Sequence, residues 1–187
     1  MDKRLSIEPA RLGGLALVRG ERFADHRGAF ARLFCSDELA PLLGARRIVQ
    51  ANHSRTARVG AVRGMHFQRP PHAEMKLVRC LRGRVWDVAL DLRAGSPTFL
   101  HWQAFELSAD NGHMLVIPEG CAHGFQVLEP DSELLYLHTA AYAPAAEGGV
   151  RHDDPRAGIG WPLPVADVSA RDRGHALLTA DFPGIAL

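Results

Sequence analysis

Short apolar segments separated by glycine and proline dominate the middle of this 187-residue chain, and they restrict the folds open to it. Residues 75–81 and 84–92 are rich in valine and leucine and flank Gly83, a pattern that predicts a hairpin of two strands. Further strands are predicted at 98–107, 114–117 and 132–142. Many short strands with regular turns favour an antiparallel sandwich or barrel, of which a jelly roll is the natural form.

In the early part of the chain, only residues 36–44 have apolar residues at the spacing of a helix. Ser36 is a suitable N-cap there, and Gly44 is a suitable end. From residue 144 onward, Gly, Pro, Asp and Arg accumulate, which predicts a loop-rich C-terminal wrap. We therefore expect a single all-β domain over 1–187, with an N-terminal strand arm and a few short peripheral helices.

Charge and cysteine usage narrow the possible partners. The 22 Lys+Arg and 21 Asp+Glu residues nearly cancel, so nucleic acid is not expected to bind. No apolar run reaches the about 18 residues that a membrane helix needs, and residues 1–8 lack the apolar stretch of a secretory signal. Three widely spaced cysteines argue against a disulfide framework, so we expect a cytoplasmic protein without a membrane partner.

Two segments, 60–68 and 117–125, resemble the paired motifs of cupin barrels. In metal-binding cupins the first motif supplies two histidines one residue apart, but here Gln68 follows His66. His66 and His123 alone make a poor catalytic metal site, which usually needs three protein ligands. We therefore expect no metal and no other cofactor. A metal-dependent cupin oxygenase or isomerase, with His72 or Glu74 as further ligands, remains the alternative of another enzyme class.

A cofactor-free reaction has its candidates in His66, Lys76 and Tyr136. Removal of a proton beside a ketone needs a base, and it needs a cation or hydrogen bonds at the oxygen that becomes an enolate. Returning the proton to the opposite face needs a second group, such as a phenol. These three side chains suffice for an epimerisation, whereas a non-catalytic sugar-binding cupin would need no aligned base and acid.

Ordered matches over nearly the whole length resemble the dTDP-4-dehydrorhamnose 3,5-epimerase family. The stretches that carry the resemblance are 25–30, 50–54, 62–68, 76–78, 95–99, 122–125, 142–144, 153–155, 161–162 and 169–172. The resemblance implies an isomerase that inverts C3, C5 or both in a nucleotide-diphosphate 4-keto-6-deoxyhexose through an enolate, in deoxysugar biosynthesis. It also implies a homodimer that exchanges N-terminal strands.

The resemblance assigns roles residue by residue. His66 matches the base, Asp172 its orienting carboxylate, Lys76 the cation at the C4 oxygen and Tyr136 the proton donor on the opposite face. The substrate-binding positions implied are Arg27 and Arg63 for the diphosphate, Phe30, Gln50, Asn52 and Tyr142 for the nucleotide, and His123, Arg32, Glu147 and Arg171. No role is assigned to His53, His101, His138 and His152.

Two departures from the family pattern bear on chemistry. Arg32 stands where the family has a glutamate that accepts a hydrogen bond from thymine, and a guanidinium suits cytosine better. A CDP-linked 4-keto sugar inverted at C3 or C5 is therefore an alternative substrate, unless Arg32 turns to solvent. Glu74 replaces a usual glutamine, and it either pairs with Lys76 or faces outward.

Overall fold

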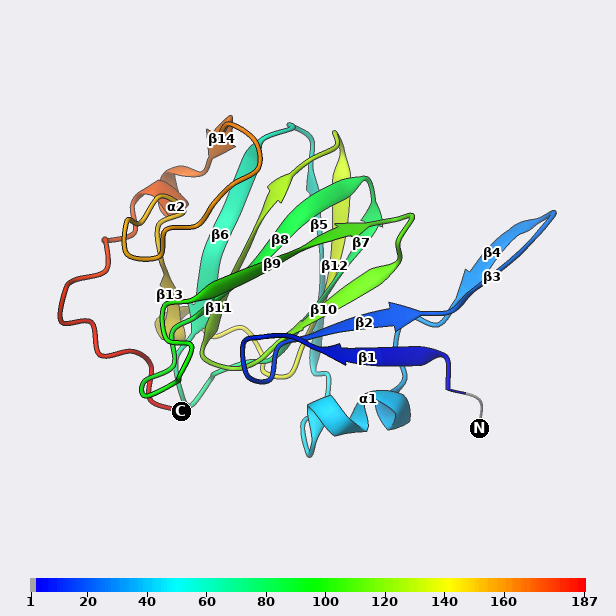
Figure 1. Cartoon of the computed structure of the whole chain (residues 1–187), viewed down its shortest axis with the longest axis horizontal. Helices are drawn as coiled ribbons and strands as arrows, with labels where there is room; N and C mark the ends of the chain where they lie inside the picture. The colour runs from blue at the N-terminus through cyan, green and yellow to red at the C-terminus, as the bar shows by residue number, and fades with distance from the viewer. Residues whose placement is uncertain (1–2) are drawn as a thin grey trace.

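Two antiparallel sheets face each other in the computed structural model, which describes residues 3–187 (Figure 1). The first sheet has the strand order β1 (Leu5–Pro9), β2 (Ala16–Gly20), β10 (His113–Ile117), β7 (Lys76–Arg82), β12 (Ser132–His138) and β5 (Gln50–Thr56). The second has the order β13 (Glu147–Gly149), β6 (Ala61–Gln68), β11 (Cys121–Val127), β8 (Arg84–Asp91) and β9 (Trp102–Ser108). The predicted all-β jelly-roll sandwich is confirmed.

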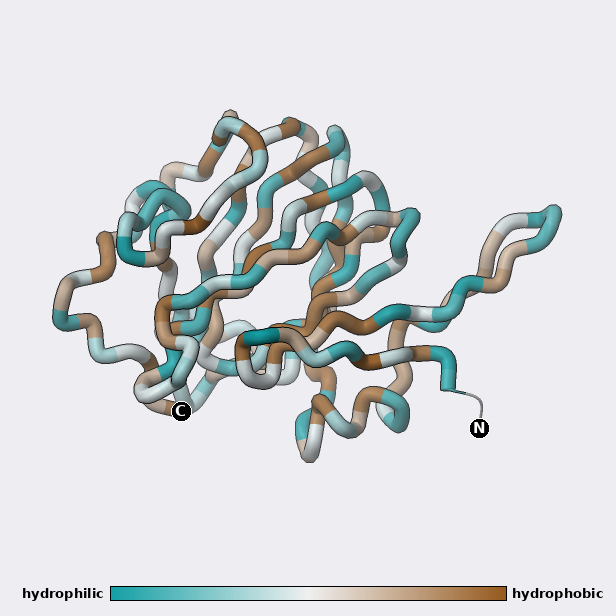
Figure 2. The backbone as a smooth tube through the Cα atoms, viewed as in Figure 1, coloured by the Kyte–Doolittle hydropathy of each residue, from teal (hydrophilic) through white to brown (hydrophobic). Residues whose placement is uncertain are grey.

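The main core lies between the two sheets, where alternate residues of each strand point inward. Leu17, Val78 and Leu115 from the first sheet meet Val85 and Phe125 from the second, all of them buried. Figure 2 shows hydrophobic and hydrophilic residues interspersed along the strands of the sandwich. Because these apolar side chains fill the space between the sheets, the register of each strand determines which polar side chains face the open end of the sandwich.

The connection at Gly83 differs from the predicted hairpin. β7 pairs with β10 and β12, whereas β8 pairs with β11 and β9, so the turn is a corner that carries the chain from one sheet to the other. Gly83 has φ +72°, and a Cβ there would lie 2.5 Å from Ser132 Oγ, so the corner requires glycine. Two apolar segments flanking a glycine predict adjacency in sequence, but the partner of each strand depends on the whole sandwich.

Three other boundaries moved from their predicted places. The strand expected at 98–107 begins at Trp102, because Thr98 lies in the turn before it and its hydroxyl donates to Asp91 at the end of β8. The strand expected at 132–142 ends at His138. The helix is confirmed as α1 (Ser36–Leu43) and ends at Gly44, but Cys35 is its N-cap and no side chain caps it.

Two peripheral parts extend from the sandwich. β3 (Arg22–Asp25) and β4 (Gly28–Ala31) form a hairpin that projects from the body (Figure 1). Beyond η1 (Pro144–Ala146) and β13, the chain is loop-rich, with β14 (Asp167–Val168) parallel to β6 and a short helix, α2 (Ala170–Arg173). Within residues 3–187, none of the helices has the length and apolar character to cross a membrane.

Candidate active site

A cavity of about 780 Å³ lies at one end of the sandwich, lined by both sheets and by the segment around α2. All four predicted catalytic residues line it: His66 on β6, Lys76 on β7, Tyr136 on β12 and Asp172 on α2. Six predicted substrate-binding residues line it as well, namely Asn52, Arg63, His123, Tyr142, Glu147 and Arg171. Gln50 borders it through hydrogen bonds to Asn52 and to the Tyr142 backbone.

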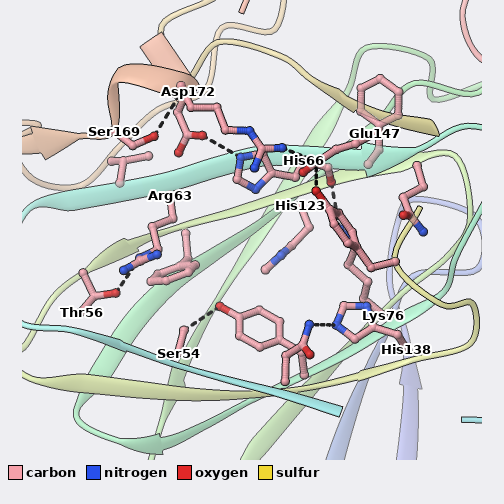
Figure 3. Close-up of a pocket in the computed structure, with 18 of the residues that line it drawn as sticks. Ser54, Thr56, Arg63, His66, Lys76, His123, His138, Glu147, Ser169 and Asp172 are labelled. Carbon is pink, nitrogen blue, oxygen red and sulfur yellow. Dashed lines mark hydrogen bonds and ion pairs between the residues drawn. The ribbon is translucent and has the colours of Figure 1, made fainter. Parts of the chain in front are cut away.

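The imidazole of His66 is held by Asp172, with 2.8 Å between Nε2 and Oδ1 (Figure 3). Burial alone would raise the pKa of Asp172, but the hydrogen bond and charge of His66 and the Gly64 amide lower it below its ordinary value. An ionised carboxylate accepts the Nε2 proton of His66, which leaves Nδ1 as the basic nitrogen. The pair is therefore arranged as a base with an orienting carboxylate.

Close backbone contacts at Gly64 bring the two elements of this pair together. The Gly64 amide donates to Asp172 Oδ2 at 3.2 Å, and Asp172 is itself held by Ser169, whose hydroxyl caps α2. A Cβ on Gly64, at φ +117°, would lie 2.5 Å from Gly124 Cα. Glycine is therefore needed where β6 passes β11, two residues before His66.

Lys76 lies beneath His66 with its ammonium group buried. Lys76 Nζ donates to the His66 backbone oxygen at 3.1 Å and lies 3.3 Å from Glu74 Oε1. Of the two possibilities for Glu74, the structure has the carboxylate turned inward to pair with Lys76. A buried cation needs such a counter-charge, because desolvation otherwise opposes it.

Tyr136 faces the cavity from the opposite sheet to His66. Its hydroxyl lies 3.0 Å from Ser54 Oγ on β5, and burial raises the pKa of the phenol well above its ordinary value. Tyr136 thus holds its proton at any ordinary pH and can donate it. Ser54 carried no signal in the sequence, because its link to Tyr136 depends on the pairing of β5 with β12.

His123 lies opposite His66 on the neighbouring strand β11. Its Nε2 is 3.0 Å from the carboxylate of Asp87, which is fully buried on β8. Asp87 was not predicted, although a lone carboxylate inside an apolar strand is a signal of a buried polar partner. The Tyr136 ring packs edge-on against His123, with 6.0 Å between centroids.

Charged side chains form the mouth of the cavity. Arg63 is exposed, and its Nε donates to Thr56 Oγ1 at 2.9 Å while its Nη2 donates to the Arg55 backbone oxygen at 3.5 Å. On the far side, Glu147 pairs with Arg171 and accepts a hydrogen bond of 2.7 Å from the Tyr142 hydroxyl. Arg63 and Arg171 are thus both exposed at the entrance, where an anionic group would meet them.

Three predicted substrate-binding residues lie away from this cavity. Arg27 and Phe30 are on the projecting β3–β4 hairpin, and Phe30 is 73% exposed. Arg32 follows the hairpin and pairs with Glu38 of α1. Within one chain, none of the three contacts the residues that line the cavity in the part of the structure described.

The second histidine position of the first cupin motif has a structural role here. Gln68 Oε1 accepts from the Ala143 amide at 2.6 Å, and its Nε2 donates to the backbone oxygens of His72 and Ala141. Gln68 therefore holds the loop that carries Tyr142.

The side chains that lie close enough together to share a metal ion differ from the metal ligands considered in the sequence analysis. Among residues 3–187, His66, Asp172 and His175 place one donor atom each within 4.8 Å of one another. His66 belongs to both sets, whereas His123 contacts Asp87 and Glu74 contacts Lys76. His138, expected to have no role, is also a correction: it is buried and lines the cavity.

Taken together, a histidine–carboxylate pair, a buried ammonium and a protonated phenol converge on one cavity from both sheets. This arrangement can remove a proton from carbon, stabilise the resulting oxyanion and return a proton from another side.

Comparison with known proteins identifies relatives of the same architecture. A family model for dTDP-4-dehydrorhamnose 3,5-epimerase matches residues 9–180. The enzyme of that name from Sinorhizobium fredii is 44% identical over 146 residues, 78% of this chain and 75% of the relative. A dTDP-4-dehydrorhamnose 3-epimerase of Streptomyces niveus is 37% identical over 175 residues, 93% of this chain and 84% of the relative. A solved Legionella pneumophila dTDP-6-deoxy-D-glucose-3,5-epimerase, in complex with dTDP-4-keto-L-rhamnose, superimposes with a TM-score of 0.89 at 35% identity, covering 97% of this chain and 98% of that one.

Proposed function

Because the chain belongs to the dTDP-4-dehydrorhamnose 3,5-epimerase family, we propose that it inverts carbons beside the ketone of a dTDP-linked 4-keto-6-deoxyhexose. The enzyme is an isomerase of deoxysugar biosynthesis. The observation that carries the proposal is the convergence of His66, Asp172, Lys76 and Tyr136 on one cavity.

Each of these side chains has one role in the proposed reaction. Nδ1 of His66 takes the proton from the carbon next to the ketone, and the electron pair of that C–H bond moves to form an enolate at the C4 oxygen. The ammonium of Lys76 stabilises the negative oxygen. Tyr136 then gives a proton to the opposite face of the carbon, and the ketone is restored with inverted configuration.

The nucleotide is proposed to be dTDP, in keeping with the substrates named for the relatives. Arg32, the residue that favoured CDP, is paired with Glu38 in the same chain. This pair directs Arg32 toward α1 and away from the residues that line the cavity. The CDP-linked sugar is therefore the second substrate to be compared in the deuterium-exchange experiment described below.

A homodimer is proposed from the projecting hairpin. Phe30 is exposed on it, and the Arg27 side chain is 78% exposed although it pairs with Asp25. Insertion of this hairpin into a second copy would bring Arg27 and Phe30 to the cavity mouth, where the diphosphate and base are proposed to bind. We further propose a cytoplasmic location, because Cys35, Cys80 and Cys121 are all free thiols.

Proton NMR in heavy water tests the reaction directly. The protein is incubated with dTDP- or CDP-4-keto-6-deoxyglucose, with and without a chelator, and deuterium entry at C3 and C5 is followed. We expect exchange with the dTDP sugar that survives the chelator. No exchange with either sugar would refute the epimerase, and loss of exchange in the chelator would favour a metal at His66, Asp172 and His175.

Two variants accompany this measurement. His66→Ala is expected to abolish exchange, because it removes the base. His101→Ala is the control, since His101 is exposed and is not among the residues that line the cavity. Equal loss of exchange in both variants would mean that His66 is not the base.

A further inference from the structure

A second carboxylate–imidazole pair lies in the cavity, formed by Glu74 and His138. His138 Nδ1 is 2.7 Å from Glu74 Oε2, and both side chains are less than a tenth exposed. The other oxygen of Glu74 faces Lys76 Nζ at 3.3 Å. Glu74 therefore lies between His138 and the ammonium group that is proposed to stabilise the enolate.

Hydrogen bonds continue from this pair to the rim of the cavity. His138 Nε2 is 3.3 Å from Asn52 Nδ2, an interaction drawn in Figure 3. Asn52 Oδ1 is 3.2 Å from Gln50 Nε2, and Gln50 Oε1 is 2.9 Å from the backbone nitrogen of Tyr142. The chain thus runs from the exposed Tyr142 to the buried Lys76.

The direction of every hydrogen bond follows from the two ends, because a backbone N–H and an ammonium can only donate. The Tyr142 amide donates to Gln50, so the Gln50 nitrogen faces Asn52 and the Asn52 nitrogen faces His138. Nε2 of His138 must then accept, which places the imidazole proton on Nδ1, facing Glu74.

A chain that begins and ends with a donor needs one member that accepts from both sides. Glu74 is that member, because a carboxylate accepts at both oxygens. A glutamine would accept from Lys76 and present its NH₂ group to His138. The imidazole proton would then move to Nε2 and oppose the Asn52 nitrogen, leaving two donors face to face.

We propose that Glu74 and His138 are positioning residues, which orient Lys76 through a hydrogen-bond chain that only a carboxylate at position 74 completes. Lys76 uses two of its three N–H bonds on Glu74 and the His66 carbonyl, which leaves the third for the enolate oxygen. The inference rests on the proposed function, in which Lys76 contacts that oxygen.

The protonation state of Glu74 agrees with this role. Burial alone would raise the pKa of its carboxyl, but the hydrogen bond from His138 and the charge of Lys76 lower it below its ordinary value. Glu74 is therefore an anion that accepts from both neighbours.

Long-range proton–nitrogen NMR of the imidazoles tests the chain without substrate. The His138 signals are identified by their loss in His138→Gln. We expect the wild type to carry the proton on Nδ1 and Glu74→Gln to carry it on Nε2. A wild-type proton on Nε2 would overturn the direction of the chain.

Steady-state kinetics test the effect on Lys76. Glu74→Gln is expected to lower kcat about tenfold, the effect of a lost charge-assisted hydrogen bond, with KM changed less than about twofold. Glu133→Gln is the matched control, because Glu133 contacts His53 at 3.1 Å on the outer face of the same strand pair. An equal fall in kcat in both variants, or none in either, would overturn the role of Glu74.

A compensating variant distinguishes a mismatch of donors and acceptors in the chain from a nonspecific loss of stability caused by the substitution. Glu74→Gln combined with Asn52→Asp moves the two-sided acceptor from position 74 to 52 and keeps the total charge. We expect the double variant to recover most of the thermal stability lost in Glu74→Gln, with the His138 proton on Nε2. Additive loss of stability would overturn the chain. If the wild type catalysed no deuterium exchange, the proposed function would be refuted, and with it the role of Lys76 at the enolate oxygen. The tautomer of His138 would still show whether the hydrogen-bond chain runs in the proposed direction.

Discussion

Tyr136 and His66 face the cavity from different sheets, so the two proton transfers proposed for them can be separated by substitution. Tyr136→Phe removes only the phenol oxygen and leaves His66 and Lys76 in place. We expect deuterium exchange to continue while the epimerised product falls by about 100-fold or more, the usual contribution of a general acid. Both are followed by proton NMR.

The control for this prediction is Ser54→Ala, which removes the 3.0 Å partner of the phenol but keeps the acid itself. It is expected to reduce epimerisation far less than Tyr136→Phe. Full epimerisation by Tyr136→Phe would show that another group returns the proton.

For single residues, motifs in the sequence predicted which side chains line the cavity but not which residues they contact. His66 lies in a recognisable motif and Lys76 stands out because only two lysines occur in the chain. The partners of Asp87 and His138 could not be predicted, because their contacts cross from one strand to another. Such contacts depend on strand register, and a shift of one residue would turn these side chains to the other face.

The turn after β8 concentrates polar contacts on one buried carboxylate. The buried carboxylate of Asp91 accepts from the Arg93 guanidinium and, at 2.6 Å each, from the Ser96 and Thr98 hydroxyls. Burial alone would raise the pKa of Asp91, but these hydrogen bonds lower it to about 2. They also explain why β9 starts later than its sequence suggests.

This turn makes a prediction about stability and pH. Between pH 4 and about 2 the unfolded chain binds a proton at Asp91 that the folded chain does not, so stability falls as pH decreases through this window. Asp91→Asn is expected to flatten that dependence and to cost roughly 2–3 kcal/mol at pH 7, measured by urea unfolding.

Asp153→Asn is the comparison for Asp91→Asn. Asp153 also pairs with an arginine two residues away, Arg151, but at the surface. It should change the free energy of unfolding by less than about 0.5 kcal/mol. Equal effects of the two substitutions would contradict the importance of burial at the turn.

Elements themselves were predicted more reliably than their partners. The apolar patterns of β7 and β8 correctly indicated strands, yet the corner at Gly83 sends them to opposite sheets. The helix α1 was correct in extent, because Pro41 and Gly44 restrict it locally. Local chemistry decides where an element ends, whereas pairing is decided by the packing of two whole sheets.

For the whole molecule, the proposed exchange of the β3–β4 hairpin predicts that activity can be restored by mixing inactive chains. Arg27→Ala impairs the hairpin and His66→Ala impairs the cavity. In a mixed dimer the intact hairpin of one chain would meet the intact cavity of the other. Refolding the two variants together should recover about a quarter of wild-type exchange, since half of random dimers are mixed and each has one complete site.

Light scattering gives the mass of the same samples. A mass of two chains with no recovery on mixing would refute the exchange of the hairpin, and a mass of one chain would refute the dimer.

The fold class and the cavity residues could be predicted from this sequence, but the place of Arg27, Phe30 and Arg32 relative to the cavity could not. In the proposed dimer, their positions would depend on the surface of a second molecule.

The His66–Asp172 contact joins residues 106 positions apart in the sequence. Protein synthesis proceeds from the N-terminus, so a nascent chain can complete its sandwich strands, including His66, Lys76 and Tyr136, before the carboxylate has been made. Until Asp172 emerges, the imidazole has no anion to fix its tautomer. In the proposed reaction, a partly synthesised chain would therefore lack an oriented base, and activity would begin only when the C-terminal segment has folded onto β6.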